Sequence, residues 1–102
     1  MKSILIAVAA LAATLSAPAF ANADLAKAKN CMTCHAVDKK IVGPAYKDVA
    51  AKYAKDKDAT AKLAEKIIKG GSGAWGPVPM PPNTQVTPDE AKKLAAWVLT
   101  VK

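Results

Sequence analysis

The chain contains the stretch Cys31-Met32-Thr33-Cys34-His35, and this stretch decides what the rest of the sequence must fold around. Its spacing is C-x-x-C-H, the attachment pattern for c-type haem. Two residues between the cysteines let both sulfurs reach the two vinyl groups on one porphyrin edge, as thioethers. The adjacent imidazole then lies under the ring centre, where it can bind iron. The motif therefore predicts one covalently bound haem c, attached through Cys31 and Cys34, with His35 as an axial iron ligand.

Two other chemistries use paired cysteines, and the sequence favours neither of them. A thiol–disulfide C-x-x-C motif usually lies at a helix start beside a strand, and no convincing strand pattern is found here. A structural zinc site needs four good ligands. Residues 22–102 contain no cysteine or histidine besides those of the motif, so haem attachment remains the favoured interpretation.

The second axial ligand has to come from a residue other than histidine, because His35 is the only histidine in the chain. Methionine, lysine, asparagine, water or an open site are the candidates. Met32 is held between the two cysteines, too close to one ring edge to cross the haem, and Met1 belongs to a predicted leader. Met80 remains, in a proline-rich segment whose fixed φ angles can present a thioether at small entropic cost. A plain packing role is the alternative for Met80, and axial ligation is favoured beside this motif.

The first 21 residues have the features of an export signal. Lys2 gives a positive start, residues 4–15 are almost entirely apolar, and residues 19–21 give a small-x-small cleavage pattern. A retained membrane anchor is the alternative, but the apolar run is shorter than the roughly 18–20 residues that span a bilayer. The sequence therefore predicts a cleaved signal peptide over residues 1–21, a single domain over residues 22–102, a periplasmic location and no stable membrane insertion.

The composition of the remaining domain sets further limits. The 102-residue chain has a net charge of +7, and removal of Lys2 leaves 14 lysines, 8 acids and a net charge of +6. The size excludes a multidomain enzyme, two cysteines exclude a disulfide-rich mini-protein, and the absence of arginine speaks against nucleic-acid binding. About 81 alanine-rich residues build only a thin core, and this length lies close to the roughly 70–80 residues at which an apolar core alone is marginal. A buried cofactor would supply the missing apolar surface.

The periodicity of apolar residues predicts an all-α domain with four helices and no strand. The expected helices cover residues 24–31, 44–54, 58–69 and 87–101. Their expected starts are an N-cap at Asp24, a first turn at Pro44, a start near Asp58 and a Thr87–Glu90 capping box. Their apolar stripes include Cys31 in the first helix, Ala54 in the second, Thr60 in the third and Val101 in the fourth. Gly70 and Gly71 are expected to end the third helix.

The segment between the third and fourth predicted helices is a long loop over residues 70–86. It contains four glycines and four prolines, which exclude a helix or a central strand. A loop of this length in a small domain is usually functional or disordered, and its apolar residues Trp75, Val78 and Met80 argue against disorder. We therefore expect this loop to wrap around the cofactor.

Three segments carry a resemblance to the small bacterial class I cytochromes c. They are NCMTCHAVDKKIVGPAYKDVAAKYA, GGSGAWGPVPMPPN and AKKLAAWVL, and together they cover nearly all of residues 22–102. The resemblance implies a small class I cytochrome c fold, in which about four helices wrap around one covalently bound haem c. Further roles are also implied by the resemblance. The Pro44 carbonyl would accept a hydrogen bond from the axial histidine, Asn83 would donate to the methionine sulfur, and Trp75 would contact a haem propionate.

The sequence departs from the family pattern at two places. Many relatives have an arginine near the end of the third helix, contacting a propionate, and this chain has Lys66 there. A lysine can still neutralise a propionate, but only as a point charge. Residues 84–88 are about one residue longer than in some relatives.

The resemblance implies a soluble, monomeric periplasmic electron carrier, not an enzyme, with a low-spin haem ligated by His35 and Met80. Its redox partners would be an upstream cytochrome complex in the membrane and a downstream nitrite reductase or oxidase. Lysines near the motif and loop would face an acidic patch on a partner; they are Lys29, Lys39, Lys40, Lys66 and Lys69. Two alternatives remain: a haem enzyme or gas-binding protein with a labile Met80, and a docked subunit of a larger complex.

Overall fold

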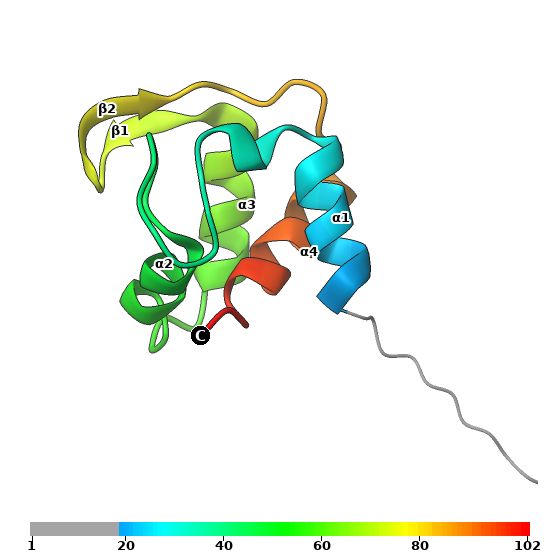
Figure 1. The fold of residues 1–102 in the computed structure, drawn as a ribbon, viewed down its shortest axis with the longest axis horizontal. Coiled ribbons are helices and arrows are strands. Elements are labelled where there is room, and N and C mark those ends of the chain that lie inside the picture. The colour runs from blue at the N-terminus through cyan, green and yellow to red at the C-terminus, as the bar shows by residue number, and fades with distance from the viewer. Residues whose placement is uncertain (1–18) are drawn as a thin grey trace, which may run out of the picture.

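The computed structural model describes residues 19–102, which form four α-helices, one 3₁₀ turn and one two-stranded sheet (Figure 1). The elements are α1 (Ala19–Ala28), the 3₁₀ turn η1 (Cys31–Thr33), α2 (Tyr46–Lys52), α3 (Ala59–Lys69), β1 (Gly71–Gly73), β2 (Gly76–Met80) and α4 (Pro88–Val98). The predicted fold class is confirmed as mostly helical, with one small sheet that the sequence did not predict. Residues 1–18 of the predicted signal peptide lie outside the described residues.

Helix α1 differs from its prediction at both ends. It begins at Ala19 and not at Asp24, because the alanine-rich residues before Asp24 favour helix and continue it backwards. At the other end, Asn30 adopts the left-handed conformation with φ of 68°. This residue ends the helix, so Cys31 lies in the separate turn η1 and not on α1.

Helix α2 begins at Tyr46, two residues after the proline that was expected in its first turn. Its first two N–H groups are satisfied by earlier backbone: Tyr46 N donates to the carbonyl of Ala36 at 2.9 Å, and Lys47 N donates to that of Val37 at 3.0 Å. This pairing fixes α2 against the segment that follows the motif. The helix ends at Lys52, so Ala54 lies beyond it and is exposed.

The predicted boundaries of α3 are confirmed. Asp58 occupies the N-cap position, and Gly70 ends the helix with φ of 70°, donating its N–H to the Lys66 carbonyl at 2.7 Å. A side chain at position 70 would collide with the carbonyl of Met80, so glycine is required there on two grounds. The expected burial of Thr60 is wrong, because that residue is exposed.

Helix α4 has the capping box that the sequence predicted. Thr87 Oγ1 accepts a hydrogen bond from the Glu90 N–H at 3.1 Å, and Glu90 Oε1 accepts one from the Thr87 N–H at 3.0 Å. The helix ends at Val98, and Val101 therefore lies after the helix and not on it. Val101 still packs against the core from there.

The two strands form an antiparallel hairpin, which corrects the expectation of a strand-free chain. Gly71 pairs with Met80 and Gly73 with Gly76, with an irregular register between them. Prolines are tolerated in β2 because a two-stranded sheet leaves each strand with one edge that needs no donor. The hairpin follows α3 directly and extends from the end of that helix, and the segment after β2 runs back toward α1, as Figure 1 shows.

The core is formed mainly where α4 packs against α3 and α1 (Figure 1). Its buried members are Ala26, Tyr46, Val49, Ala64, Val86, Ala91, Leu94, Ala95, Trp97 and Val98. Leu94 is the only large side chain among them that is at most 2% exposed. Over residues 19–102, no helix has the length and apolar character needed to cross a bilayer.

Candidate haem site

A cavity of about 650 Å³ lies between the motif segment, α2, the end of α3 and the β1–β2 hairpin. Sites for small molecules and cofactors commonly have volumes of about 300–1,000 Å³. The cavity walls include all eight residues singled out from the sequence: Cys31, Cys34, His35, Pro44, Lys66, Trp75, Met80 and Asn83. Core residues such as Leu94 and Val98 line it too, which gives it an apolar wall against α4.

The two cysteines are presented by a tight turn. Asn30 and Cys31 accept the backbone hydrogen bonds of Thr33, Cys34 and His35, at 3.1–3.3 Å. Both thiols are half-buried, are not joined in a disulfide and line the cavity. Burial raises the pKa of the Cys31 thiol, so it is held in the neutral form in the absence of a covalent partner.

The His35 ring is held on two sides. Its Nδ1 lies 2.8 Å from the Pro44 carbonyl oxygen, which is the hydrogen bond that the resemblance implied. Its face stacks on the Tyr46 ring, with centroids 5.0 Å apart and planes at 21°. Because a carbonyl can only accept, Nδ1 carries the proton and Nε2 keeps a lone pair for a metal ion.

Gly43 shows how closely the backbone approaches the imidazole. A Cβ built on this residue would lie 2.5 Å from His35 Cε1 and 2.9 Å from Nδ1, closer than atoms can pack. The same residue donates its N–H to the Cys34 carbonyl at 2.7 Å, which ties it to the motif. Gly43 was not singled out from the sequence, because the approach of its backbone to the imidazole is seen only in the folded chain.

Met80 is the last residue of β2 and lines the same cavity as His35, from a different element. It is only partly exposed, and Pro81 and Pro82 follow it directly. The cavity therefore has an imidazole with a free Nε2 and a thioether in its walls, which are the donor types that His/Met-ligated haem uses.

Asn83 donates to backbone carbonyls, and its implied contact with the Met80 sulfur stays a prediction. Its Nδ2 donates to the Ile67 carbonyl at 2.8 Å and lies 3.4 Å from the Pro81 carbonyl, and no bond to the Met80 sulfur is found within residues 19–102. The physical reason is the end of α3, where Ile67 has a carbonyl without an intrahelical partner. Asn83 satisfies this carbonyl with both its side chain and its backbone N–H, the latter at 3.2 Å.

Trp75 and Lys66 lie on the hairpin side of the cavity. Trp75 is 42% exposed, so it is not a core residue, and Lys52 Nζ lies 5.0 Å from its ring centroid. Lys66 Nζ reaches the hairpin, where a Cβ on Gly71 would lie 2.7 Å from it. Lys52 was missed by the sequence analysis, since no pattern relates a residue at the end of α2 to a tryptophan in a distant loop.

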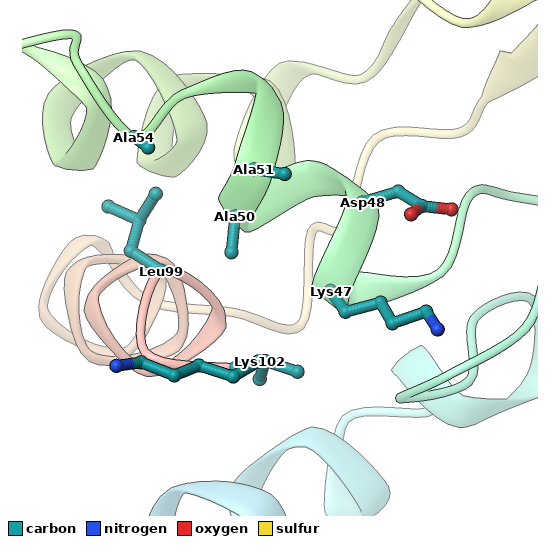
Figure 2. Close-up of a pocket in the computed structure, with 8 residues that line it drawn as sticks. Lys47, Asp48, Ala50, Ala51, Ala54, Leu99 and Lys102 are labelled. Carbon is teal, nitrogen blue, oxygen red and sulfur yellow. The ribbon is translucent and has the colours of Figure 1, made fainter.

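A second, more open pocket of about 430 Å³ lies between α2 and the C-terminal residues, on a face that carries none of the predicted site residues. Figure 2 shows Ala50, Ala54 and Leu99 facing one another across it, with Lys47 and Lys102 at its edge. It contains no cysteine, histidine or methionine, so the motif chemistry belongs to the larger cavity alone.

The fold and the site together define a small helical protein with a cavity of cofactor size between a C-x-x-C-H segment and a loop that contains a methionine. Comparison with known proteins agrees with this class. The family model "Cytochrome c" matches residues 21–102, and the chain belongs to this family as a small class I bacterial cytochrome c. It therefore carries one covalently attached haem c and is a small electron-transfer protein.

Several relatives and solved structures are similar over most of the chain. Cytochrome c-552 of Hydrogenobacter thermophilus is 57% identical over 101 residues, covering 99% of this chain and 98% of the relative. Cytochrome c-551 of Pseudomonas aeruginosa is 59% identical over 78 residues, covering 76% of this chain and 74% of the relative. The crystal structure of Nitrosomonas europaea cytochrome c552 has a TM-score of 0.77 at 59% identity, over 78% of this chain and 99% of that one.

Proposed function

We propose that this protein is a periplasmic one-electron carrier whose low-spin haem is attached to Cys31 and Cys34 and ligated by His35 and Met80. The observation that carries the proposal is that all four side chains line one cavity, with the His35 Nδ1 already donating to the Pro44 carbonyl. When bound, haem supplies an iron ion that can take up and release a single electron. The rest of the site controls the environment in which this happens.

Each residue of the cavity has a defined task in this proposal. The Pro44 carbonyl and the Tyr46 ring fix the orientation of the imidazole, so that Nε2 points to one place. Met80 offers a soft thioether, which favours Fe(II) and raises the reduction potential. With both axial positions filled, no position is open for a substrate, and this supports a carrier over an enzyme.

The proposed electrostatics use the lysines that border the cavity. Lys66 Nζ lies beside the hairpin, where it can neutralise a propionate as a point charge, and Trp75 lines the same wall. Lys40 also lines the cavity, and its neighbour Lys39 is exposed. Lys69 is exposed too, although it pairs with Glu65 at 2.9 Å. These charges support docking to an acidic patch on a redox partner.

The proposed location and partners follow from the leader and from the family. Division of the chain into a signal peptide over residues 1–21 and a domain over residues 22–102 is supported by the family match, which covers residues 21–102. We infer an upstream membrane cytochrome complex, a downstream nitrite reductase or oxidase, and a monomeric carrier. Exposed Val42 and Val78 line the cavity, and they would give such partners an apolar contact beside the lysines.

Stopped-flow electron transfer to an isolated acceptor, measured against ionic strength, tests this function. We expect the second-order rate to fall as salt rises, because the Debye length shortens from about 30 Å at 0.01 M to about 8 Å at 0.15 M. The double variant Lys39→Ala/Lys40→Ala should be slower at low salt and less dependent on salt. The matched variant Lys55→Ala/Lys57→Ala removes two exposed lysines away from the cavity and should change the rate less. Rates that do not change with salt would contradict electrostatic docking.

A further inference from the structure

Residues 29 and 85 are joined by a reciprocal pair of hydrogen bonds. Lys29 Nζ donates to the Gln85 backbone carbonyl at 3.0 Å, and Gln85 Nε2 donates to the Lys29 backbone carbonyl at 3.0 Å. Lys29 follows α1 and stands two residues before Cys31, whereas Gln85 lies between β2 and α4. The pair therefore links the segment that carries the cysteines to the segment that follows Met80.

The link continues from Gln85 into the methionine loop. Gln85 Nε2 also lies 3.1 Å from Asn83 Oδ1, and Asn83 Nδ2 donates to the Ile67 carbonyl at the end of α3, at 2.8 Å. One side-chain amide thus connects the end of α1 with a residue that is itself fixed to α3. Because the carboxamide of Asn83 accepts on one side and donates on the other, its orientation is defined by both neighbours.

The Lys29 side chain is held in turn by the start of α4. Its Nζ lies 3.3 Å from Glu90 Oε1, the same atom that accepts the Thr87 N–H in the capping box. The Lys29 side chain is only 24% exposed, so it is not a free surface cation as the sequence analysis assumed. Val86, next to Gln85, is buried in the core and fixes the backbone at this point.

We propose that Gln85 is a positioning residue that clasps the Met80 segment to the cysteine segment and so limits how readily the Met80 thioether leaves the iron. The inference rests on the proposed function in one respect, the assignment of Met80 as the second axial ligand. Pro81 and Pro82 stand between Met80 and Asn83, and their fixed φ angles make this connection short and stiff. A constraint at residues 83 and 85 is therefore transmitted to residue 80.

The rate of cyanide binding to the oxidised holoprotein measures this constraint, because cyanide can enter only when the thioether has moved away. Gln85→Ala removes two side-chain hydrogen bonds and should raise the binding rate by about tenfold. Gln85→Glu keeps the size of the side chain but replaces the donor with a carboxylate that faces two acceptor oxygens. It should bind cyanide at least as fast as Gln85→Ala. A rate equal to that of the unmodified protein in both variants would overturn the proposal.

A control separates this local effect from a general loss of stability. Leu99→Ala shortens an apolar side chain in the second pocket (Figure 2), away from the clasp. Unfolding of each variant by denaturant gives its loss in the free energy of unfolding. The cyanide binding rates are then compared between variants that have similar losses. A Leu99→Ala rate that rises as much as that of Gln85→Ala would overturn the clasp and leave only general destabilisation.

The same measurements distinguish failure of the clasp from failure of the proposed function. The unmodified oxidised protein should show the weak long-wavelength sulfur-to-iron charge-transfer band. If this band is missing, Met80 is not the ligand, and both the axial assignment and the clasp inference are overturned. If the band is present and the Gln85 variants bind cyanide at the original rate, only the clasp inference is overturned.

Discussion

The side of the molecule built from α1, α3 and α4 packs side chain against side chain, whereas the side built from residues 31–53 and 70–83 surrounds a cavity. On the first side, alanines, Leu94 and Val98 bury one another, and a complete capping box starts α4. On the second side, Ile41, Val42 and Val78 are about half exposed or more. Its segments are held mainly by backbone hydrogen bonds and by close approaches such as Gly43 to His35.

This difference indicates that the two sides of the domain are stabilised by different contacts. The helical side contains most of the buried apolar contacts, while the cavity side contributes Tyr46 and Val49 to the core and otherwise consists largely of loops and the hairpin. Attached haem would supply the apolar surface that the second side faces. Substitutions on the cavity side should therefore report on the cofactor, and substitutions on the helical side should report on the helices.

The largest effect is expected from removing both attachment points, in the variant Cys31→Ala/Cys34→Ala. Without a covalent cofactor, the cavity stays unfilled, and the chain should be largely unfolded. Circular dichroism during heating measures the remaining helix. Thr33→Ala, between the two cysteines, is the matched control and should fold and melt cooperatively. Cooperative, native-like melting of the double variant would show that the helical side is sufficient on its own.

Met80→Ala is expected to change the electronic state of the site and leave the helices intact. Loss of the thioether should convert the haem from low spin to high spin and lower its reduction potential. Axial ligands set haem potentials over a range of roughly 0.8 V, and the decrease should lie within it. Potentiometric titration measures the potential and circular dichroism checks the helices. Met32→Ala removes the other methionine of the domain and should leave the potential nearly unchanged. A low-spin Met80→Ala protein with the original potential would mean that another residue is the ligand.

Gly43→Ala tests the close approach on the cavity side. The added methyl group would meet the His35 ring at 2.5 Å, so we expect a loss of about 1–3 kcal/mol in the free energy of unfolding, as for other overpacked sites. The haem absorption spectrum should change as well, since the imidazole must move. Gly76→Ala is a useful control, because its added Cβ meets nothing within 4 Å and the backbone strain comes only from its φ of 112°. Its spectrum should stay the same.

The smallest effect is expected on the helical side, at the capping box. The hydrogen bond from the Thr87 N–H lowers the pKa of Glu90 below its ordinary value of 4.5, and Lys29 contributes to the same shift. A lowered pKa in the folded state stabilises the protein above the unfolded pKa, and this contribution is lost as the pH falls through the folded value. Glu90→Gln keeps an acceptor at this position but does not titrate. The difference in the free energy of unfolding between the unmodified protein and Glu90→Gln should therefore shrink from about pH 5 downwards. A difference that does not change with pH would contradict this role of the charge.

Sequence reasoning predicted the features that depend on short stretches of chain. The Gly70 stop and the Thr87–Glu90 capping box are each encoded within a few residues, and the described structure has the corresponding helix end and cap. The start of the C-x-x-C-H motif was expected on the first helix, and it lies instead in the separate turn η1. The start of α1 was predicted wrongly because nothing local distinguishes Asp24 as a cap from Asp24 inside an alanine-rich helix.

The features that were missed depend on contacts between distant segments. Asn83 donates to Ile67 because the path of the loop brings it to the end of α3, which no local pattern indicates. The Lys52–Trp75 contact and the Lys29–Gln85 pair also join segments that are far apart in the sequence. The hairpin was missed because Pro77 and Pro79 are poor strand formers in general and are tolerated only in the special case of an edge strand.

The absorption spectrum of the unmodified, oxidised protein tests most directly whether the cavity side is closed around haem by His35 and Met80. The account predicts a low-spin spectrum with the weak long-wavelength sulfur-to-iron charge-transfer band, at neutral pH and without added ligand. A high-spin spectrum that lacks this band would contradict it, because the methionine loop would then leave the iron open to small molecules.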